Sequence, residues 1–156
     1  MRLTAVKMNE KFAKEIVSWR YPAPYDLYNM DENDIAELMN DDYGAIVDET
    51  LTLVGFYCTG SSAQVPAGRH VGGYGEEFTD IGLGLRPNLT GIGNGYTFLR
   101  YILSIIGDEP LRLTVATFNQ RGIKLYEKFG FTRGIEFSNG KTEFVVMSVI
   151  NKIKRR

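Results

Sequence analysis

The alternation of apolar and polar residues predicts strands and helices in turn along the chain. The clearest strand is 111–116, where every second residue is large and apolar. The clearest helix is 95–106, where apolar side chains recur at helical spacing and Gly107 provides a stop. Further strands are expected at 3–8, 44–47, 51–58, 81–85, 131–137 and 143–150, and further helices near 9–19, 31–40 and 120–129.

These elements follow one another in the order β-α-α-β-β-β-α-β-α-β-β, which predicts an α/β or α+β fold with a mixed sheet. Residues 19–28 and 61–75 are rich in Pro, Gly or aromatic side chains and are expected to form loops. Because no repeat, low-complexity tract or linker divides the chain, one domain is expected over 1–150, followed by a basic tail at 151–156.

Composition and charge exclude several classes of function. The chain has 156 residues with 18 basic and 19 acidic side chains, so it offers no electrostatic surface typical of binding to nucleic acid or an anionic membrane. The single cysteine, Cys58, and single histidine, His70, argue against a disulfide, a metal site or a Ser-His-Asp triad. The start has no signal-peptide pattern, and no apolar run approaches the ~20 residues of a membrane helix. A cytoplasmic protein is therefore expected.

The strongest chemical signal is a glycine-rich turn between a strand and a helix. The turn reads Thr90-Gly91-Ile92-Gly93-Asn94-Gly95 and leads directly into the helix of 95–106. In such a turn backbone N–H groups converge, the helix dipole favours negative charge and glycine permits close approach. A pyrophosphate is the natural ligand, and a tight turn without a ligand is the alternative.

Two known phosphate motifs do not fit this turn. A P-loop ends in Gly-Lys-Ser/Thr, whereas this turn continues into Tyr96. A dinucleotide fingerprint needs G-x-G-x-x-G and an acid at the end of the next strand, whereas here glycines alternate and strand 111–116 is followed by Thr117. A nucleotide-binding oxidoreductase or phosphotransferase is therefore the less favoured alternative.

A second group of polar side chains belongs to the helix of 120–129. Asn119 and Tyr126 are seven residues apart, just under two turns, so they face the same way roughly 10 Å apart. Such a pair could touch two points of an extended cofactor. Each also has a structural explanation, because Asn119 suits a helix N-cap and Tyr126 suits an aromatic core residue beside Ile123.

These two motifs, in this order, resemble those of the GNAT superfamily of N-acetyltransferases. In that family a strand and often a proline precede Gln/Arg-x-x-Gly-x-Gly/Ala and a helix. Pro87 and residues 90–95 match this pattern, except that Thr90 replaces Gln or Arg. The second family motif, a strand, an Asn and a helix ending Tyr-x-x-x-Gly-Phe, is matched by Asn119 and residues 126–131. The resemblance spans nearly the whole chain, and its specific part covers about 80–131.

The resemblance implies a single-domain GNAT-like fold with a mixed, mostly antiparallel twisted sheet of about six to seven strands flanked by about four helices. It also implies acetyl-coenzyme A as cofactor and transfer of the acetyl group to a primary amine, either a small molecule or a protein N-terminus, by direct attack in a ternary complex. A sensor that binds acetyl-coenzyme A without turnover is the alternative. The implied cofactor contacts are Leu83, Gly84, Leu85, Thr90, Gly91, Ile92, Gly93, Asn94, Gly95, Asn119 and Tyr126.

Tyr126 is the candidate general acid, because a phenol with an ordinary pKa of ~10 can protonate a thiolate whose conjugate acid has a pKa of ~8.5. A base must also take a proton from the amine. Asp80 is the first candidate, followed by Glu77 and Glu76, and each of these acids could equally be an exposed loop residue.

In the family, the segment between the first two helices borders the acceptor pocket. Aromatic walls and a carboxylate there would suit a cationic amine, whereas the alternative is a loop whose aromatic rings cover the core. Loop 61–75 is a second candidate lid, and the apolar strand 143–150 suggests pairing with a second copy in a homodimer. The candidate substrate-binding residues are Trp19, Tyr21, Tyr25, Asp26 and Tyr28.

Overall fold

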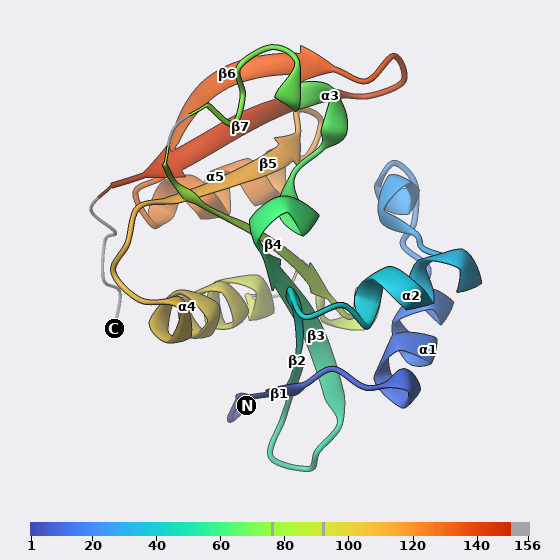
Figure 1. Ribbon diagram of the computed structural model, residues 1–156. Coiled ribbons are helices and arrows are strands. Elements are labelled where there is room, and N and C mark those ends of the chain that lie inside the picture. The colour runs from blue at the N-terminus through green and yellow to red at the C-terminus, as the bar shows by residue number, and fades with distance from the viewer. Residues whose placement is uncertain (76, 92, 151–156) are drawn as a thin grey trace. The chain divides into compact units, whose positions relative to one another are not determined.

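The computed structural model describes residues 1–75, 77–91 and 93–150 (Figure 1). The chain divides into two compact units. The first contains residues 1–58 and 83–101, and the second contains residues 59–82 and the chain from 102 onward. Strand β4 (Thr79–Leu85) and helix α4 (Asn94–Ile106) each begin in one unit and end in the other. The expected basic tail, 151–156, lies outside the described residues, and the single domain expected over 1–150 stays a prediction.

The first unit is built on antiparallel strands. Its elements in chain order are β1 (Thr4–Lys7), α1 (Glu10–Ser18), α2 (Ile35–Leu38), β2 (Tyr43–Val47), β3 (Leu53–Thr59), the end of β4 and the start of α4. β1 pairs with β2, and β2 pairs with β3. The register of the β2–β3 pair shifts between Ile46 and Val47. The strands predicted at 3–8, 44–47 and 51–58 are therefore confirmed.

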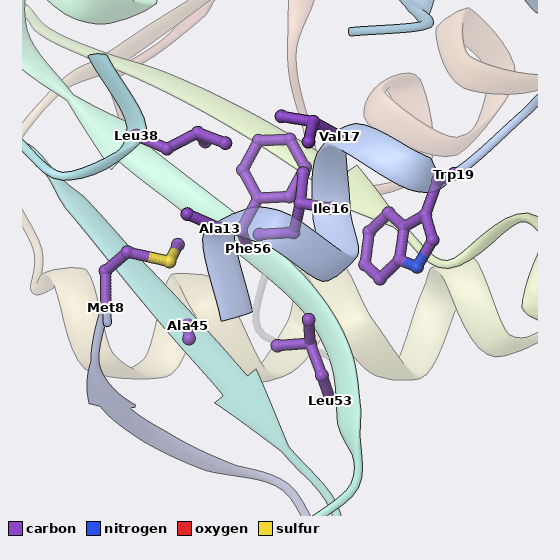
Figure 2. Packing of buried hydrophobic residues seen from close by; sticks show 9 residues of the cluster. All are labelled: Met8, Ala13, Ile16, Val17, Trp19, Leu38, Ala45, Leu53 and Phe56. Atoms are coloured by element: carbon purple, nitrogen blue, oxygen red, sulfur yellow. The ribbon is translucent and has the colours of Figure 1, made fainter. Parts of the chain in front are cut away.

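Helix α1 closes one hydrophobic core of this unit (Figure 2). The side chain of Asn9 caps the helix by accepting a hydrogen bond from the N–H of Phe12 at 2.8 Å. Helical spacing then turns the apolar residues of α1 to one side, where they pack against α2, β2 and β3. The cluster consists of Met8, Ala13, Ile16, Val17, Trp19, Leu38, Ala45, Leu53 and Phe56.

The helix predicted at 31–40 is shorter in the structure. Asp31 and Asp34 form a capping box. The Asp34 side chain accepts a hydrogen bond from the N–H of Asp31, and the Asp31 side chain accepts one from the N–H of Asn33. This arrangement produces a 3-10 turn at Glu32–Asp34, and only Ile35–Leu38 are α-helical. The loop expected over 19–28 contains a further 3-10 turn, Tyr25–Tyr28.

Two glycines allow β3, the end of β4 and α4 to approach closely. A Cβ atom on Gly55 would lie 2.5 Å from the carbonyl oxygen of Gly84 and 2.5 Å from the ring of Phe98. A Cβ atom on Gly84 would overlap the ring of Phe56. The glycine within the strand predicted at 81–85 is therefore explained by tight packing in the first unit.

We expect Gly55→Ala to lower the free energy of unfolding by ~1–3 kcal/mol or more. The added methyl group meets a backbone carbonyl, which cannot turn aside as a flexible side chain could. Gly75→Ala is a suitable control, because its Cβ atom would have only one ordinary contact, 3.7 Å from the Gly72 carbonyl oxygen. Urea denaturation measures both, and an equal effect in the two variants would contradict the packing argument.

The second unit contains the remaining strands and helices. Its elements in chain order are α3 (Pro66–Arg69), the start of β4, the end of α4, β5 (Leu111–Ala116), α5 (Gln120–Lys128), β6 (Thr132–Ser138) and β7 (Glu143–Val149). β4 and β5 are parallel, with Thr79 opposite Leu111, whereas β5–β7 and β6–β7 are antiparallel. The short helix α3, within the loop expected at 61–75, was not predicted.

Strand β4 takes part in the strand pairing of both units, and the order of the strands is β1-β2-β3-β4-β5-β7-β6. Within the part of the chain that the structure describes, the sheet has seven strands, and four of its pairings are antiparallel while β4–β5 is parallel. The predicted mixed, mostly antiparallel sheet of an α/β fold is therefore confirmed. No helix within the described ranges is long and apolar enough to cross a membrane.

Strand β7, which the sequence suggested could pair with a second copy, is paired on both sides within the chain. It is hydrogen-bonded to β5 on one side and to β6 on the other. Its apolar composition is explained by burial, because Phe144 and Val146 pack with Ala116 and Phe137 in a core cluster of the second unit. Residues 143–149 therefore offer no free strand edge to a second copy, and the homodimer itself stays a prediction.

Candidate active site

The glycine-rich turn is open and adopts a backbone conformation that needs glycine. After the 3-10 turn Pro87–Leu89, Gly91 has φ 79° and Gly93 has φ 83°, both in the left-handed region. Both residues are exposed, and no atom lies within 4 Å of the position that a Cβ atom on Gly93 would occupy. The backbone at the start of α4 is therefore accessible to an anionic ligand. Ile92, another predicted cofactor contact, lies outside the described residues.

Thr90 supports this turn with both of its hydrogen-bond donors. Its Oγ1 donates to the carbonyl oxygen of Pro87 at 2.8 Å, and its N–H donates to the same oxygen at 3.2 Å. Asn94 adds a bond from Nδ2 to the carbonyl oxygen of Leu89 at 3.2 Å. Because these donors are already used, Thr90 shapes the turn in this arrangement and has no proton left to donate to a phosphate.

The end of β4, predicted to contact the pantetheine arm, lies in the first unit. Leu83, Gly84 and Leu85 are half-buried. The carbonyl oxygen of Leu85 accepts a hydrogen bond from Tyr21 Oη at 2.6 Å. One backbone acceptor of this strand segment is therefore occupied by the protein itself, which the sequence did not indicate.

Asn119 and Tyr126 lie on α5 in the second unit. The Asn119 side chain accepts a hydrogen bond from the N–H of Gly122 at 2.9 Å, so the N-cap that was one of its two interpretations is confirmed. Tyr126 is half-buried and makes an edge-to-face contact with Phe131, with ring centroids 6.1 Å apart. The cofactor contacts of both residues and the acid role of Tyr126 stay predictions.

Asp80, the first candidate for the base, is held in a buried ion pair. Arg112 Nε lies 2.6 Å from Oδ1 and Nη2 lies 2.8 Å from Oδ2, and Gln64 Nε2 donates to Oδ2 at 2.8 Å. Both carboxylate oxygens are engaged, and the residue is only 4% exposed. These contacts give Asp80 a structural role in the β4–β5 pair, and its role as the base stays a prediction. Glu77 is exposed, and Glu76 lies outside the described residues.

The Asp80–Arg112 pair also anchors the segment before β4. The Arg112 guanidinium lies over the rings of Tyr74 and Phe78, at 5.1 and 5.5 Å from the two centroids. Gln64, which bonds Asp80, accepts a hydrogen bond from Arg69 Nε at 3.0 Å. The glycine-rich segment 61–75, predicted as a second candidate lid, is therefore tied to the β4–β5 pair through polar contacts.

The residues predicted to bind the acceptor have different environments. Trp19 belongs to the hydrophobic core, is 9% exposed and packs on Phe56 (Figure 2), so it is not an exposed aromatic wall. Burial raises the pKa of the Tyr21 phenol well above its ordinary value, and the hydroxyl donates to Leu85. Tyr25 is half-buried in the 3-10 turn Tyr25–Tyr28, whereas Asp26 and Tyr28 are exposed.

Most of these aromatic residues belong to an acidic segment, residues 20–42, whose charge did not enter the prediction of the site. Between residues 20 and 42 Arg20 is the only Lys or Arg. Its guanidinium donates to the carbonyl oxygens of Val17, Trp19 and Met30. The excess of acids was visible in the sequence as a local charge imbalance. The acidic residues are Asp26, Asp31, Glu32, Asp34, Glu37, Asp41 and Asp42.

Two further side chains with reactive chemistry are Cys58 and His70. Cys58 is buried, as expected for a small core residue, and His70 is exposed. Within the described ranges no group of three His, Cys, Asp or Glu side chains could hold a metal ion.

Comparison with solved structures identifies the fold. An acetyltransferase of the GNAT family from Bacillus anthracis superposes with a TM-score of 0.66 at 15% identity, covering 96% of this chain and 95% of that one. The spermidine/spermine N-acetyltransferase SpeG from Vibrio cholerae superposes with a TM-score of 0.64 at 16% identity, covering 96% and 92%. The chain has the GNAT acetyltransferase fold.

No protein-family model and no curated protein sequence matches this chain. At such low identity the similarity to GNAT structures establishes the fold, and the activity must be argued from the chain's own residues.

Proposed function

We propose that this GNAT-fold chain is an acetyl-coenzyme A-dependent N-acetyltransferase that acts on a primary amine. The observation that supports it most is the exposed turn at the start of α4, where Gly91 and Gly93 are both left-handed. Such a turn presents backbone N–H groups and the positive end of a helix dipole to an anion. These features suit the pyrophosphate of coenzyme A.

Acetyl transfer makes modest demands on the protein. An ammonium group must first give up one proton, because its nitrogen has no lone pair. The uncharged amine nitrogen then attacks the thioester carbonyl carbon, a C–N bond forms, the C–S bond breaks, and the nitrogen loses one further proton while the leaving sulfur gains one. In our proposal the phenol of Tyr126 supplies the proton to sulfur. The proton from nitrogen leaves through water or an exposed carboxylate, for which Glu77 remains the candidate among the acids predicted at first.

We further propose that the acceptor amine is cationic. Exposed Asp26 and Tyr28 lie within the acidic segment of residues 20–42, where the only basic side chain donates to backbone carbonyl oxygens. Carboxylates and aromatic faces both attract ammonium groups. Initial-rate assays with spermidine and with short peptides bearing a free N-terminus would separate a small-molecule amine from a protein N-terminus.

Gly93→Glu should abolish binding of coenzyme A while leaving the chain folded. The new carboxylate would enter open space in the turn, where it would repel a pyrophosphate. Wild-type protein should gain ~2.7 kcal/mol of apparent stability at a ligand concentration 100 times the dissociation constant, and a thermal-shift assay measures this gain.

Gly140→Glu is the matched control for this substitution. Gly140 also has a positive φ, 94°, and no atom lies within 4 Å of its Cβ position, but it lies in the β6–β7 hairpin. Both variants therefore carry similar backbone strain, and only Gly93→Glu should lose the thermal shift. If wild type is stabilised by NAD or ATP and not by coenzyme A or acetyl-coenzyme A, the proposal is wrong and the turn binds a nucleotide.

The sensor hypothesis is the second candidate, and Thr90 is the observation that favours it. The structure adds that both donors of Thr90 are used within the turn, so the side chain that replaces Gln or Arg adds no donor for the cofactor. A sensor would show the same thermal shift with coenzyme A and no turnover with any amine.

A further inference from the structure

The aromatic loop, which we define as residues 19–30, is joined to the end of β4 by one hydrogen bond from a tyrosine. Tyr21 Oη donates to the carbonyl oxygen of Leu85 at 2.6 Å, across 64 residues of sequence. The N–H of Tyr21 donates to Asn29 Oδ1 at 2.8 Å. The same residue therefore closes the loop on itself and connects it to the strand.

Local hydrogen bonds hold the aromatic loop together as one piece. Arg20 Nη1 donates to the carbonyl oxygen of Trp19 at 2.7 Å and to that of Met30 at 3.0 Å, so it bridges the two ends of the loop. Within the loop, the N–H of Tyr25 donates to Pro22 and that of Asn29 donates to Asp26. A displacement of Tyr21 should therefore move the loop as a unit.

The residue after Leu85 makes further contacts with the base of this loop. The Arg86 guanidinium forms an ion pair with Glu15 of α1 and lies over the ring of Trp19, 5.9 Å from its centroid. The N–H of Arg86 donates to the carbonyl oxygen of Val54 at 2.9 Å, which fixes this point to β3. The strand end and the loop base thus share a small group of contacts within the first unit.

The Tyr21 phenol is suited to a permanent donor role. Burial raises its pKa well above the ordinary value, so the hydroxyl keeps its proton at any physiological pH. The 2.6 Å distance from Tyr21 Oη to the Leu85 carbonyl oxygen indicates a well-formed hydrogen bond.

We infer that Tyr21 is a positioning residue that couples the cofactor strand to the aromatic loop. This inference rests on the proposed function, in which Leu83–Leu85 contact the cofactor and the loop borders the amine. A ligand that fixes the orientation of the Leu85 carbonyl also fixes Tyr21 and, through it, the loop. Because such coupling is reciprocal, coenzyme A and the amine assist each other's binding.

Hydrogen exchange measured by mass spectrometry tests this coupling without knowledge of the amine. Coenzyme A is the probe, and the readout is the exchange rate of backbone amides in residues 19–30, with and without it. The test variant is Tyr21→Phe, which keeps the ring and removes the donor. The matched control is Tyr101→Phe, because Tyr101 Oη accepts a hydrogen bond from the N–H of Ala5 at 2.8 Å, another long-range, partly buried bond of the first unit that does not involve the loop.

In wild type we expect coenzyme A to slow exchange in the aromatic loop by about 5-fold or more. In Tyr21→Phe the thermal shift with coenzyme A should persist while this protection is lost, and Tyr101→Phe should retain both. Once an acceptor is identified, Tyr21→Phe should raise the KM for that amine by a similar factor and change kcat little.

Two outcomes would overturn the coupling while leaving the proposed function intact. In one, wild type binds coenzyme A and the loop exchanges no more slowly. In the other, Tyr21→Phe shows the same protection as wild type. Absence of any thermal shift with coenzyme A in wild type would instead contradict the proposed function, and the coupling would fail with it.

Discussion

Arg112→Leu is expected to lower the free energy of unfolding by about 3–5 kcal/mol. The substitution leaves the Asp80 carboxylate in the interior of the second unit, where it has lost the guanidinium and keeps the hydrogen bond from the Gln64 amide. The two charged side chains are 6% and 5% exposed, so water cannot replace the lost guanidinium. The rings of Tyr74 and Phe78 also lose the cation that lies over them.

A double variant separates the cost of an unpaired charge from the value of the pair. In Asp80→Leu/Arg112→Leu both charges are gone, and much of the lost stability should return. Arg133→Leu is the surface control, because the Arg133–Glu127 pair is 3.6 Å apart with side chains 51% and 45% exposed. That control should cost under ~1 kcal/mol. Equal urea-denaturation midpoints for Arg112→Leu and Arg133→Leu would show that the buried pair does not stabilise the fold.

Elements with a strong local pattern could be predicted from the sequence. Helix α4 and strand β5 agree with their predicted ranges to within one residue, because their apolar spacing is regular and Gly107 ends the helix. The pattern fails where local hydrogen bonds decide the conformation. At Asp31 the capping box favours a 3-10 turn over a longer helix, and at Pro66 the ring starts a short helix inside a glycine-rich loop.

The candidate site was predictable only where it is local in sequence. The turn containing Gly91 and Gly93 lies in one continuous segment, so its chemistry could be derived from neighbouring residues. The partner of Asp80 is 32 residues away and that of Tyr21 is 64 residues away, and no periodicity indicates either pairing.

Arg112 shows why the sequence did not indicate the ion pair of Asp80. It occupies a polar position of strand 111–116, which on a half-exposed strand would face water. The structure buries it instead, on a strand with neighbours on both sides, where a charge needs a partner. Asp80, directly opposite Arg112 in the parallel β4–β5 pair, is that partner. An acid in a strand register of this kind is better interpreted as structural than as catalytic.

Tyr126→Phe is expected to reduce kcat by about 100-fold or more under the proposed function. The substitution removes only the hydroxyl, and the phenylalanine ring can keep the edge-to-face contact with Phe131, so α5 should remain in place. The dissociation constant for coenzyme A, measured by titration calorimetry, should change little. Loss of turnover with unchanged cofactor affinity is the result expected when a general acid is removed.

Tyr101→Phe is the matched control for this role. It removes a different hydroxyl, which accepts a hydrogen bond from the N–H of Ala5, and should leave kcat unchanged. If Tyr126→Phe retains a kcat within twofold of wild type, sulfur must leave without a proton from this residue. Acetyl transfer would then depend on the positioning of the amine and on polarisation of the thioester carbonyl by backbone N–H groups. The thiolate can leave unprotonated because it is already a stable leaving group near neutral pH.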